Sequence, residues 1–295
     1  QREGADGMIS GRGKVCGIMA CPVEHSLSPM MHNFYAEQMG LDFAYVPFKV
    51  LEEEVEAAVR GAYALNLQGL NITVPHKQRV IPYLKELDPT ARAVGAVNTL
   101  VRVEGGYKGY NTDAPGLWRA MREAGIGIEG QNCLLMGAGG AAKAAAFVLG
   151  SQKAASVLIL NRRKDRAAAL AEDMNRRFGR DFMAAVSLKD YKKIPDGPWL
   201  AVQTTSVGMD PDRDRALVED PEFYRKIHCG VDVVYTPEKT RFMSLVEEAG
   251  GRTMNGLDML IYQGIEAFEL WNPGLKVPDR VAAQARQMMR KELEK

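Results

Sequence analysis

Side chains that could do chemistry gather in short motifs of the N-terminal third of the chain. His25-Ser26-Leu27-Ser28-Pro29 puts two hydroxyls two residues apart at a predicted helix start, beside backbone N–H groups that have no partner within the helix. Such a place suits an anionic carboxylate. Taken alone, the same pattern is also typical of a plain helix cap, with Ser28 as the N-cap and Pro29 as the first helical residue. Both interpretations stay open on these residues.

Three more motifs stand at the ends of predicted strands. They are Asn71-Ile72-Thr73-Val74-Pro75-His76-Lys77, Ala96-Val97-Asn98-Thr99 and Tyr110-Asn111-Thr112-Asp113. Each alone is compatible with turn chemistry or a surface charge. Together they supply a hydroxyl, amides and a Lys77–Asp113 pair, which are suitable hydrogen-bond partners for a small polyhydroxylated acid.

A glycine-rich turn, Gly137-Ala138-Gly139-Gly140-Ala141-Ala142, follows an apolar strand and opens an Ala-rich helix. The first glycine permits the tight turn and the second lets the backbone approach a pyrophosphate, while Ala142 fits the position that packs helix against strand. The spacing alone is weak evidence, and a plain Gly-rich turn is the alternative. The strand–turn–helix context favours a dinucleotide site.

The next predicted strand ends in Asn161-Arg162-Arg163, about 20 residues past the glycines, where an NAD site usually has an acid for the ribose 2′-hydroxyl. This strand end has two guanidinium groups instead, and these match the 2′-phosphate of NADP. A solvated basic helix start is the alternative, and Asp165 is an acid close by. We interpret the site as an NADP site.

Length and composition limit the remaining possibilities. The 295 residues predict two domains, and 46% apolar with 25% charged residues is ordinary for a globular protein and excludes general disorder. Lys and Arg total 38 against 37 Asp and Glu, so nothing favours a nucleic-acid partner. No apolar stretch is long enough to span a membrane.

Targeting and metal signals are weak. The N-terminus has no apolar signal-peptide core, and Met8 is a candidate native start after a Gly-rich lead. The four cysteines lack paired spacing, which predicts reduced thiols and a cytoplasmic protein. The four histidines are not spaced as metal ligands, so we expect no metal site.

Strand-like and helix-like runs alternate along the chain. Strands are predicted over 14–20, 43–50, 67–74 and 96–103, and helices over 28–40, 51–65 and 78–87. From residue 113 the alternation becomes regular, with helices of 10–15 residues between strands, which indicates βαβ units and a parallel sheet. The predicted fold class is α/β.

In order and at familiar spacings, the motifs HSLSP, NITVPHK, GAVNT, GYNTD, GAGGAA, NRR, TTSVG, DVVY and GLDMLIYQG resemble the shikimate dehydrogenase family over about residues 15–272. The resemblance implies two α/β domains with the active site in a cleft between them. The substrate domain would be 1–112, completed by C-terminal helices within 256–295, and the NADP-binding Rossmann domain would be 113–255.

The resemblance also implies residue roles. Ser26 and Ser28 would hold the substrate carboxylate with Tyr235 nearby, and Lys77 with Asp113 would be the catalytic pair. The ring hydroxyls would be contacted by Thr73, Lys77, Asn98, Asp113 and Gln263. The cofactor would be contacted by Gly137, Ala138, Gly139, Gly140, Ala141, Asn161, Arg162, Arg163, Thr204, Ser206, Val233, Gly256 and Met259.

The implied reaction is reversible NADP-dependent reduction of 3-dehydroshikimate to shikimate, in chorismate and aromatic amino-acid biosynthesis, by a monomer or homodimer. The nearest alternative is a quinate/shikimate dehydrogenase using NAD or NADP. Tyr262, before Gln263, is a bulky residue of the kind shared with quinate-using relatives, and His76 stands where the family often has Phe. A folate-type dehydrogenase is disfavoured by the two serines, and a non-catalytic NADP sensor by the Lys77–Asp113 pair.

Overall fold

The computed structural model describes residues 9–294, so Met8, the candidate start, lies outside the described part of the chain. The chain divides into two compact units, Gln1–Thr112 with Ile261–Lys295, and Asp113–Leu260. The chain leaves the first unit after Thr112 and returns to it inside helix α9 (Leu257–Trp271). Both units contain a sheet and helices, which confirms the predicted α/β class.

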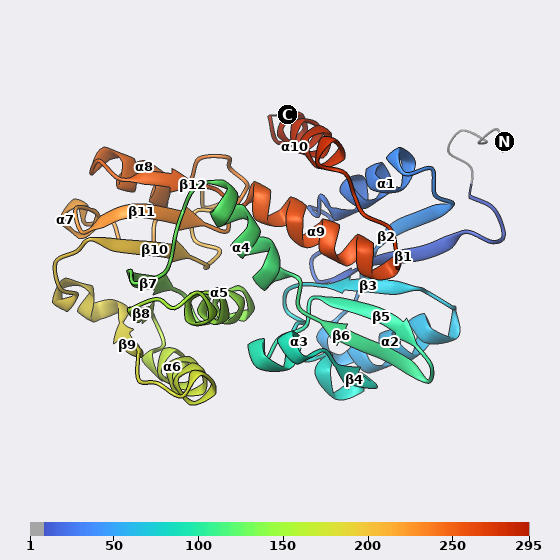
Figure 1. The fold of residues 1–295 in the computed structure, drawn as a ribbon, viewed down its shortest axis with the longest axis horizontal. Helices are drawn as coiled ribbons and strands as arrows, with labels where there is room; N and C mark the ends of the chain where they lie inside the picture. Colours follow the sequence, from blue (N-terminus) through green and yellow to red (C-terminus); the bar gives the residue numbers. More distant parts are fainter. Residues whose placement is uncertain (1–8, 295) are drawn as a thin grey trace. The chain divides into compact units, whose positions relative to one another are not determined.

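The first unit is built on a mixed six-stranded sheet in the order β2-β1-β3-β5-β6-β4 (Figure 1). Its strands are β1 (Lys14–Ala20), β2 (Phe43–Lys49), β3 (Gly69–Ile72), β4 (Glu86–Leu87), β5 (Thr99–Val103) and β6 (Gly106–Tyr110). Its helices and turns include α1 (Ser28–Gln38), η1 (Glu52–Glu54), α2 (Val55–Ala64), η2 (Ile81–Tyr83), α3 (Pro89–Val94) and α10 (Asp279–Leu293). β1 is parallel to β2 and β3, whereas β5 is antiparallel to β3 and β6.

The helix predicted over 78–87 is wrong, because this stretch forms η2 and the short strand β4. Pro82 has no N–H to donate, so a continuous α-helix over 78–87 would lose an internal hydrogen bond at this position, and only the short turn η2 forms. Instead the helix is α3, just downstream, where Asp88 accepts a capping bond from Thr90 N and Gly95 ends the helix at φ 70°.

Residues 261–295 complete the core of the first unit. Trp271 Nε1 donates to Leu100 O on β5 at 2.9 Å, and its indole occupies the space where a side chain at Gly69 of β3 would lie. The His32 ring stacks on Tyr45 with centroids 4.4 Å apart and lies 5.2 Å from the Trp271 ring. Burial lowers the pKa of His32 to about 3, so the ring is neutral.

The second unit has an all-parallel sheet in the order β12-β11-β10-β7-β8-β9 (Figure 1). This is the 3-2-1-4-5-6 order of doubly wound dinucleotide-binding folds. The strands are β7 (Asn132–Met136), β8 (Ser156–Asn161), β9 (Met183–Ser187), β10 (Trp199–Gln203), β11 (Ile227–Asp232) and β12 (Arg252–Met254). The helix α4 (Asp113–Glu123) precedes β7, and between the strands lie α5 (Gly140–Ser151), α6 (Lys164–Phe178), η3 (Leu188–Lys193), α7 (Pro221–Tyr224) and α8 (Arg241–Glu248).

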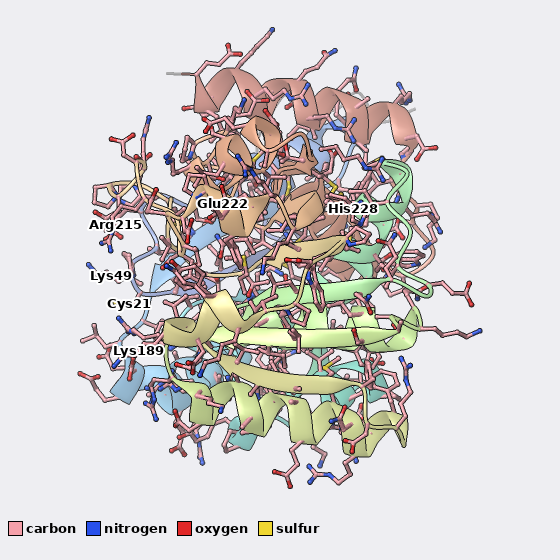
Figure 2. The ribbon with its side chains drawn as sticks, turned by 90° about the vertical axis from the view of Figure 1, so that its left-hand side faces the viewer. Cys21, Lys49, Lys189, Arg215, Glu222 and His228 are labelled. Atoms are coloured by element: carbon pink, nitrogen blue, oxygen red, sulfur yellow. The ribbon has the colours of Figure 1, made fainter. Side chains whose placement is uncertain are left out.

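The surface of the second unit carries charges of both signs. Figure 2 labels Lys189, Arg215 and Glu222, which are exposed on η3, on the connection before α7 and on α7 itself. Many exposed charges pair with a residue three or four positions away, as Glu222 does with Arg225 at 2.8 Å. Within residues 9–294, no helix is both long and apolar enough to cross a bilayer.

Candidate active site

The side chain of Asn98 joins three segments of the first unit and is 3% exposed. Its Oδ1 accepts from Thr112 N at 2.7 Å, and its Nδ2 donates to Thr112 Oγ1 at 2.9 Å and to Gln263 Oε1 at 3.4 Å. Asn98 precedes β5, Thr112 follows β6 and Gln263 lies on α9. The structure therefore brings together two predicted ring-binding amides, Asn98 and Gln263.

Further buried polar side chains connect to Asn98 through a chain of hydrogen bonds. Asn71 Nδ2 donates to Thr99 Oγ1 at 3.1 Å, and Asn71 Oδ1 accepts from Tyr45 OH at 2.7 Å. Asn71 and Thr99 meet because they are cross-strand partners in the antiparallel β3–β5 pair. Thr99 Oγ1 in turn donates to Asn98 Oδ1 at 3.1 Å. Such a satisfied buried network fixes which face each amide presents.

The two serines lie at the start of α1, but the plain cap interpretation of Ser28 is wrong. Leu27 holds the N-cap position, and Ser28 is the first helical residue. Ser26 Oγ accepts only a long bond, 3.3 Å, from Ser28 N. Ser28 is buried at 6% exposure.

The loop that follows β3 carries Thr73 and Lys77, both half-buried. Lys77 O accepts from Val97 N at 2.8 Å, which ties the backbone of Lys77 to the residue next to Asn98. His76 is fully buried, and its Nε2 donates to Val50 O at 2.8 Å. This histidine therefore gives the loop a second anchor, besides the bond between Lys77 and Val97.

Asp113, the other member of the predicted pair, is the first residue of α4 and is 6% exposed. A carboxylate in the first turn of a helix is favoured by the helix dipole. The residue before it, Thr112, is held by Asn98 through backbone and side chain. Lys77 belongs to the first unit and Asp113 opens the second.

The glycine turn between β7 and α5 fits a dinucleotide pyrophosphate. Gly137 has φ 114°, and a Cβ there would lie 2.6 Å from Thr204 Oγ1. Gly139 is the N-cap of α5, and the space where its Cβ would be is open. Ala142 is fully buried against the unit's core. The turn thus offers backbone N–H groups and close access, as an approaching phosphate requires.

The two arginines after β8 are exposed but differ in their partners. Arg163 pairs with Asp165 at 2.7 Å, and Asn161 Nδ2 donates to Arg163 O at 2.8 Å. Arg162 takes part in none of the ion pairs among residues 9–294. Arg163 therefore has an exposed ion-pair partner, whereas Arg162 has none among the described residues.

The remaining predicted residues lie in three places. Some follow the carboxyl end of β10, some follow the carboxyl end of β11, and two lie at the start of α9. Thr204 is half-buried and Ser206 exposed on the loop after β10, while Val233 and Tyr235 are half-buried after β11. Burial raises the pKa of Tyr235. Gly256 N donates to Val234 O at 2.9 Å, and any side chain at Gly256 would overlap Val233. Met259 is buried on α9.

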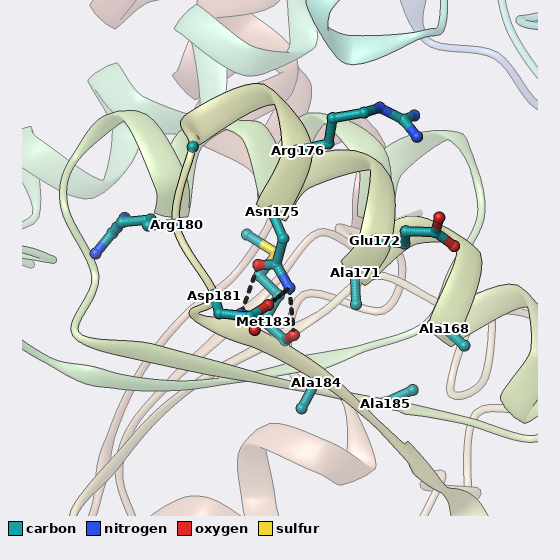
Figure 3. A pocket seen from close by; sticks show the side chains of 11 residues that line it. Ala168, Ala171, Glu172, Asn175, Arg176, Arg180, Asp181, Met183, Ala184 and Ala185 are labelled. Carbon is teal, nitrogen blue, oxygen red and sulfur yellow. Dashed lines mark hydrogen bonds between the residues drawn. The ribbon is translucent and has the colours of Figure 1, made fainter.

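A groove of about 670 Å³ lies elsewhere, between α6 and β9. Figure 3 shows the Asn175 amide bonded to the groove wall: Asn175 Nδ2 donates to Asp181 Oδ1 at 3.1 Å and to Met183 O at 2.9 Å. The lining also includes four alanines, and it contains no predicted site residue. This groove is a seam between helix and edge strand, outside the candidate site.

The sequence reasoning gave no individual role to several buried polar residues, although four of them stand in the motifs named above: Tyr45, Asn71, Thr99, Thr112, Gln203 and Asp232. The available signal was a polar residue inside an apolar strand, as with Asn71.

Within residues 9–294, no three His, Cys, Asp or Glu side chains are grouped as metal ligands. His228, labelled in Figure 2, contacts Gln131 Oε1 at 2.8 Å.

These features define a class: a two-domain oxidoreductase in which one unit has a doubly wound dinucleotide-binding sheet and the other a buried set of amides and hydroxyls. Family descriptions match in the same order: the shikimate dehydrogenase substrate binding domain at residues 18–100, shikimate/quinate 5-dehydrogenase at 120–194, and the shikimate 5'-dehydrogenase C-terminal domain at 256–285.

Individual relatives and solved structures indicate the same family. An NADP(+) shikimate dehydrogenase of Desulforamulus reducens is 42% identical over 273 residues, covering 89% of this chain and 91% of the relative. The Thermus thermophilus shikimate 5-dehydrogenase structure with NADP(H) and shikimate is 34% identical, with TM-score 0.81 over 93% of this chain and 99% of that one. The Listeria monocytogenes shikimate 5-dehydrogenase structure with shikimate and NAD is 33% identical, with TM-score 0.82 over 95% and 98%. The chain belongs to the shikimate dehydrogenase family, which confirms the resemblance.

Proposed function

We propose that this protein is an NADP-dependent shikimate dehydrogenase that interconverts 3-dehydroshikimate and shikimate in chorismate and aromatic amino-acid biosynthesis. The observation that carries the proposal is the buried junction of Asn98, Thr112 and Gln263, with Lys77 bonded through its backbone to the neighbouring Val97. A junction of oriented amides and hydroxyls recognises ring hydroxyls, and an ammonium nearby can manage a proton.

The chemistry is divided between cofactor and protein. Bound NADP+ would supply the acceptor for the hydride that leaves the carbon bearing the reacting hydroxyl. In that direction Lys77 Nζ takes the hydroxyl proton, and in the reverse direction it returns a proton to the ketone oxygen. Asp113 holds the ammonium in place by a charge-assisted hydrogen bond.

Binding roles follow the two units. In the first unit, Ser26 and Ser28 receive the substrate carboxylate, and Thr73, Asn98 and Gln263 receive ring hydroxyls. From the second unit, Tyr235 assists at the carboxylate and Arg162 meets the 2′-phosphate. The cofactor backbone and nicotinamide are contacted by Gly137, Ala138, Gly139, Gly140, Ala141, Asn161, Arg163, Thr204, Ser206, Val233, Gly256 and Met259. The domain limits proposed from sequence, 1–112 with 256–295 and 113–255, stay part of this proposal.

Compartment and assembly belong to the same proposal. All four cysteines are free thiols, three of them buried, which fits a reducing compartment such as the cytoplasm. Both a monomer and a homodimer are compatible with a site supplied by one chain.

Four parallel assays test the function: shikimate or quinate, each with NADP+ or NAD+, following formation of the reduced cofactor. We expect the highest kcat/KM with shikimate and NADP+. Similar values for shikimate and quinate would establish the quinate/shikimate alternative, which the match to a shikimate/quinate description keeps in view. NADPH binding without turnover of either acid would contradict enzymatic activity and leave a sensor.

A further inference from the structure

Asp232 and Gln203 are buried polar residues that no step of the proposed reaction uses. Asp232 ends β11 and Gln203 ends β10, and they face each other in the parallel pair. Asp232 is 0% and Gln203 1% exposed, and Gln203 Nε2 donates to Asp232 Oδ1 at 3.3 Å. A buried carboxylate without a cationic partner is uncommon, because desolvation disfavours its charged form.

Gln203 organises the loop that follows β10. Its Oε1 accepts from Thr205 N at 2.6 Å and from Thr205 Oγ1 at 2.7 Å. Its Nε2 donates to Thr205 O at 3.1 Å and to Val207 O at 3.4 Å. The backbone of residues 204–207 is thus wrapped around one side-chain amide. This segment carries Thr204 and Ser206.

Asp232 organises the loop that follows β11. Its Oδ1 also accepts from Val234 N at 2.9 Å, and its Oδ2 accepts from Thr240 Oγ1 at 2.7 Å. Thr240 is the N-cap of α8, so the carboxylate spans the connection from strand to helix. Val234 O then accepts from Gly256 N at 2.9 Å. The chain of bonds extends to the residue just before α9.

We propose that Asp232 and Gln203 are a positioning pair that sets the shape of the two loops after β10 and β11, and thereby the affinity for NADP. The inference rests on the proposed function, because Thr204, Ser206, Val233 and Gly256 are its proposed cofactor contacts. Every one of them lies within two residues of a backbone group in this network. Neither Asp232 nor Gln203 contacts a reactant, so each acts through the loops that it holds.

The test is Gln203→Met, which keeps a side chain of similar length and removes its hydrogen bonds. We expect KM for NADP+ to rise about tenfold or more, the loss that several buried hydrogen bonds carry, while KM for shikimate changes less than about twofold. Asp232→Asn keeps the shape and still accepts at one oxygen, so we expect the same split at about two- to fivefold.

Tyr224→Phe is the matched control, because Tyr224 is fully buried in the same unit and its hydroxyl donates to Val218 O, away from both loops. It should lower the melting temperature and leave both KM values within about twofold. If Gln203→Met left KM for NADP+ unchanged, or raised both KM values equally, the positioning role would be wrong. The same change in Tyr224→Phe would also overturn it.

Calorimetric titration with NADPH, without shikimate, separates this inference from the proposed function. If the wild-type protein bound NADPH but did not oxidise shikimate, the function would fail, and the positioning role would still be tested by weaker NADPH binding in Gln203→Met. Asp232→Asn serves the same measurement should Gln203→Met not fold. Equal affinity in wild type and the folded variants would overturn the inference.

Discussion

At the level of single residues, Lys77 combines a mobile side-chain type with a tightly held backbone. The loop is bonded to Val97 on one side and, through His76, to Val50 on the other. A positioned acid–base group typically contributes 10²–10⁴-fold to a rate. The held backbone at Lys77 therefore suits a side chain that transfers a proton at a fixed place.

Lys77→Ala should lower kcat by at least about 10²-fold and change shikimate binding much less, because the ammonium acts on the transition state. Steady-state kinetics and an equilibrium shikimate titration check this. A folded Lys77→Ala protein with near-normal turnover would remove Lys77 from the mechanism.

The serine pair should act in binding rather than in chemistry. Ser26→Ala with Ser28→Ala should raise KM for shikimate and leave kcat nearly unchanged, since carboxylate contacts are equally present in ground and transition states. Leu27, not Ser28, caps α1, so we expect little loss of stability. An unchanged KM for shikimate would show that the hydroxyls serve only the local turn.

We expect cofactor choice to depend mainly on Arg162, since Arg163 already pairs with Asp165. Arg162→Ala should raise KM for NADP+ about ten- to a hundredfold, the loss of one charged hydrogen-bonding group, and leave NAD+ kinetics nearly untouched. Asp165→Asn is the companion variant, which frees Arg163 and should lower KM for NADP+. Equal effects of Arg162→Ala on both cofactors would contradict a 2′-phosphate contact.

At the level of elements, α9 and the sheet of the first unit leave no spare room. Gly69→Ala would place a methyl group within the indole of Trp271, and overpacking of a dense core typically costs about 1–3 kcal/mol. Gly61→Ala on α2 has open space and should stabilise by up to about 1 kcal/mol through helix propensity. Urea unfolding of the two variants should move in opposite directions; parallel shifts would contradict this packing argument.

How much was predictable also differs by element. The β7–α5 turn and the alternation of strands and helices after residue 113 are predictable from the sequence, because both depend on local patterns. The helix predicted over 78–87 is wrong, because the apolar spacing takes no account of Pro82, which interrupts an α-helix. The contacts of Asn71 with Thr99 and of Gln203 with Asp232 depend on strand register between distant segments, which no local pattern contains.

At the level of the whole molecule, Asp232 makes stability depend on pH. Desolvation by burial raises the pKa of Asp232 from 3.8 to about 6. The folded state then binds more protons than the unfolded state between these values, so this contribution to stability is present below about pH 4 and lost as pH rises through about 6. The shift corresponds to about 3 kcal/mol.

Asp232→Asn cannot titrate, so its unfolding free energy relative to wild type should move in the variant's favour by about 2.5 kcal/mol between pH 4 and pH 7. Urea unfolding at several pH values measures the difference. Burial raises the pKa of the Tyr224 phenol in the same unit, so this group stays neutral over the range. A pH-independent difference would show that Asp232 is charged throughout.

The discontinuous first unit has a consequence for protein synthesis. A ribosome delivers residues 1–112 first, yet the Trp271 indole that packs against β3 and bonds to β5 emerges only after the whole second unit. Nascent β1, β2 and β3 must therefore wait with an unfilled core, while the contiguous second unit can close as soon as residue 260 is free. In pulsed hydrogen exchange on translating ribosomes, amides of β7 and β10 should become protected before those of β1 and β3, so the first-made part of the chain is the last to mature.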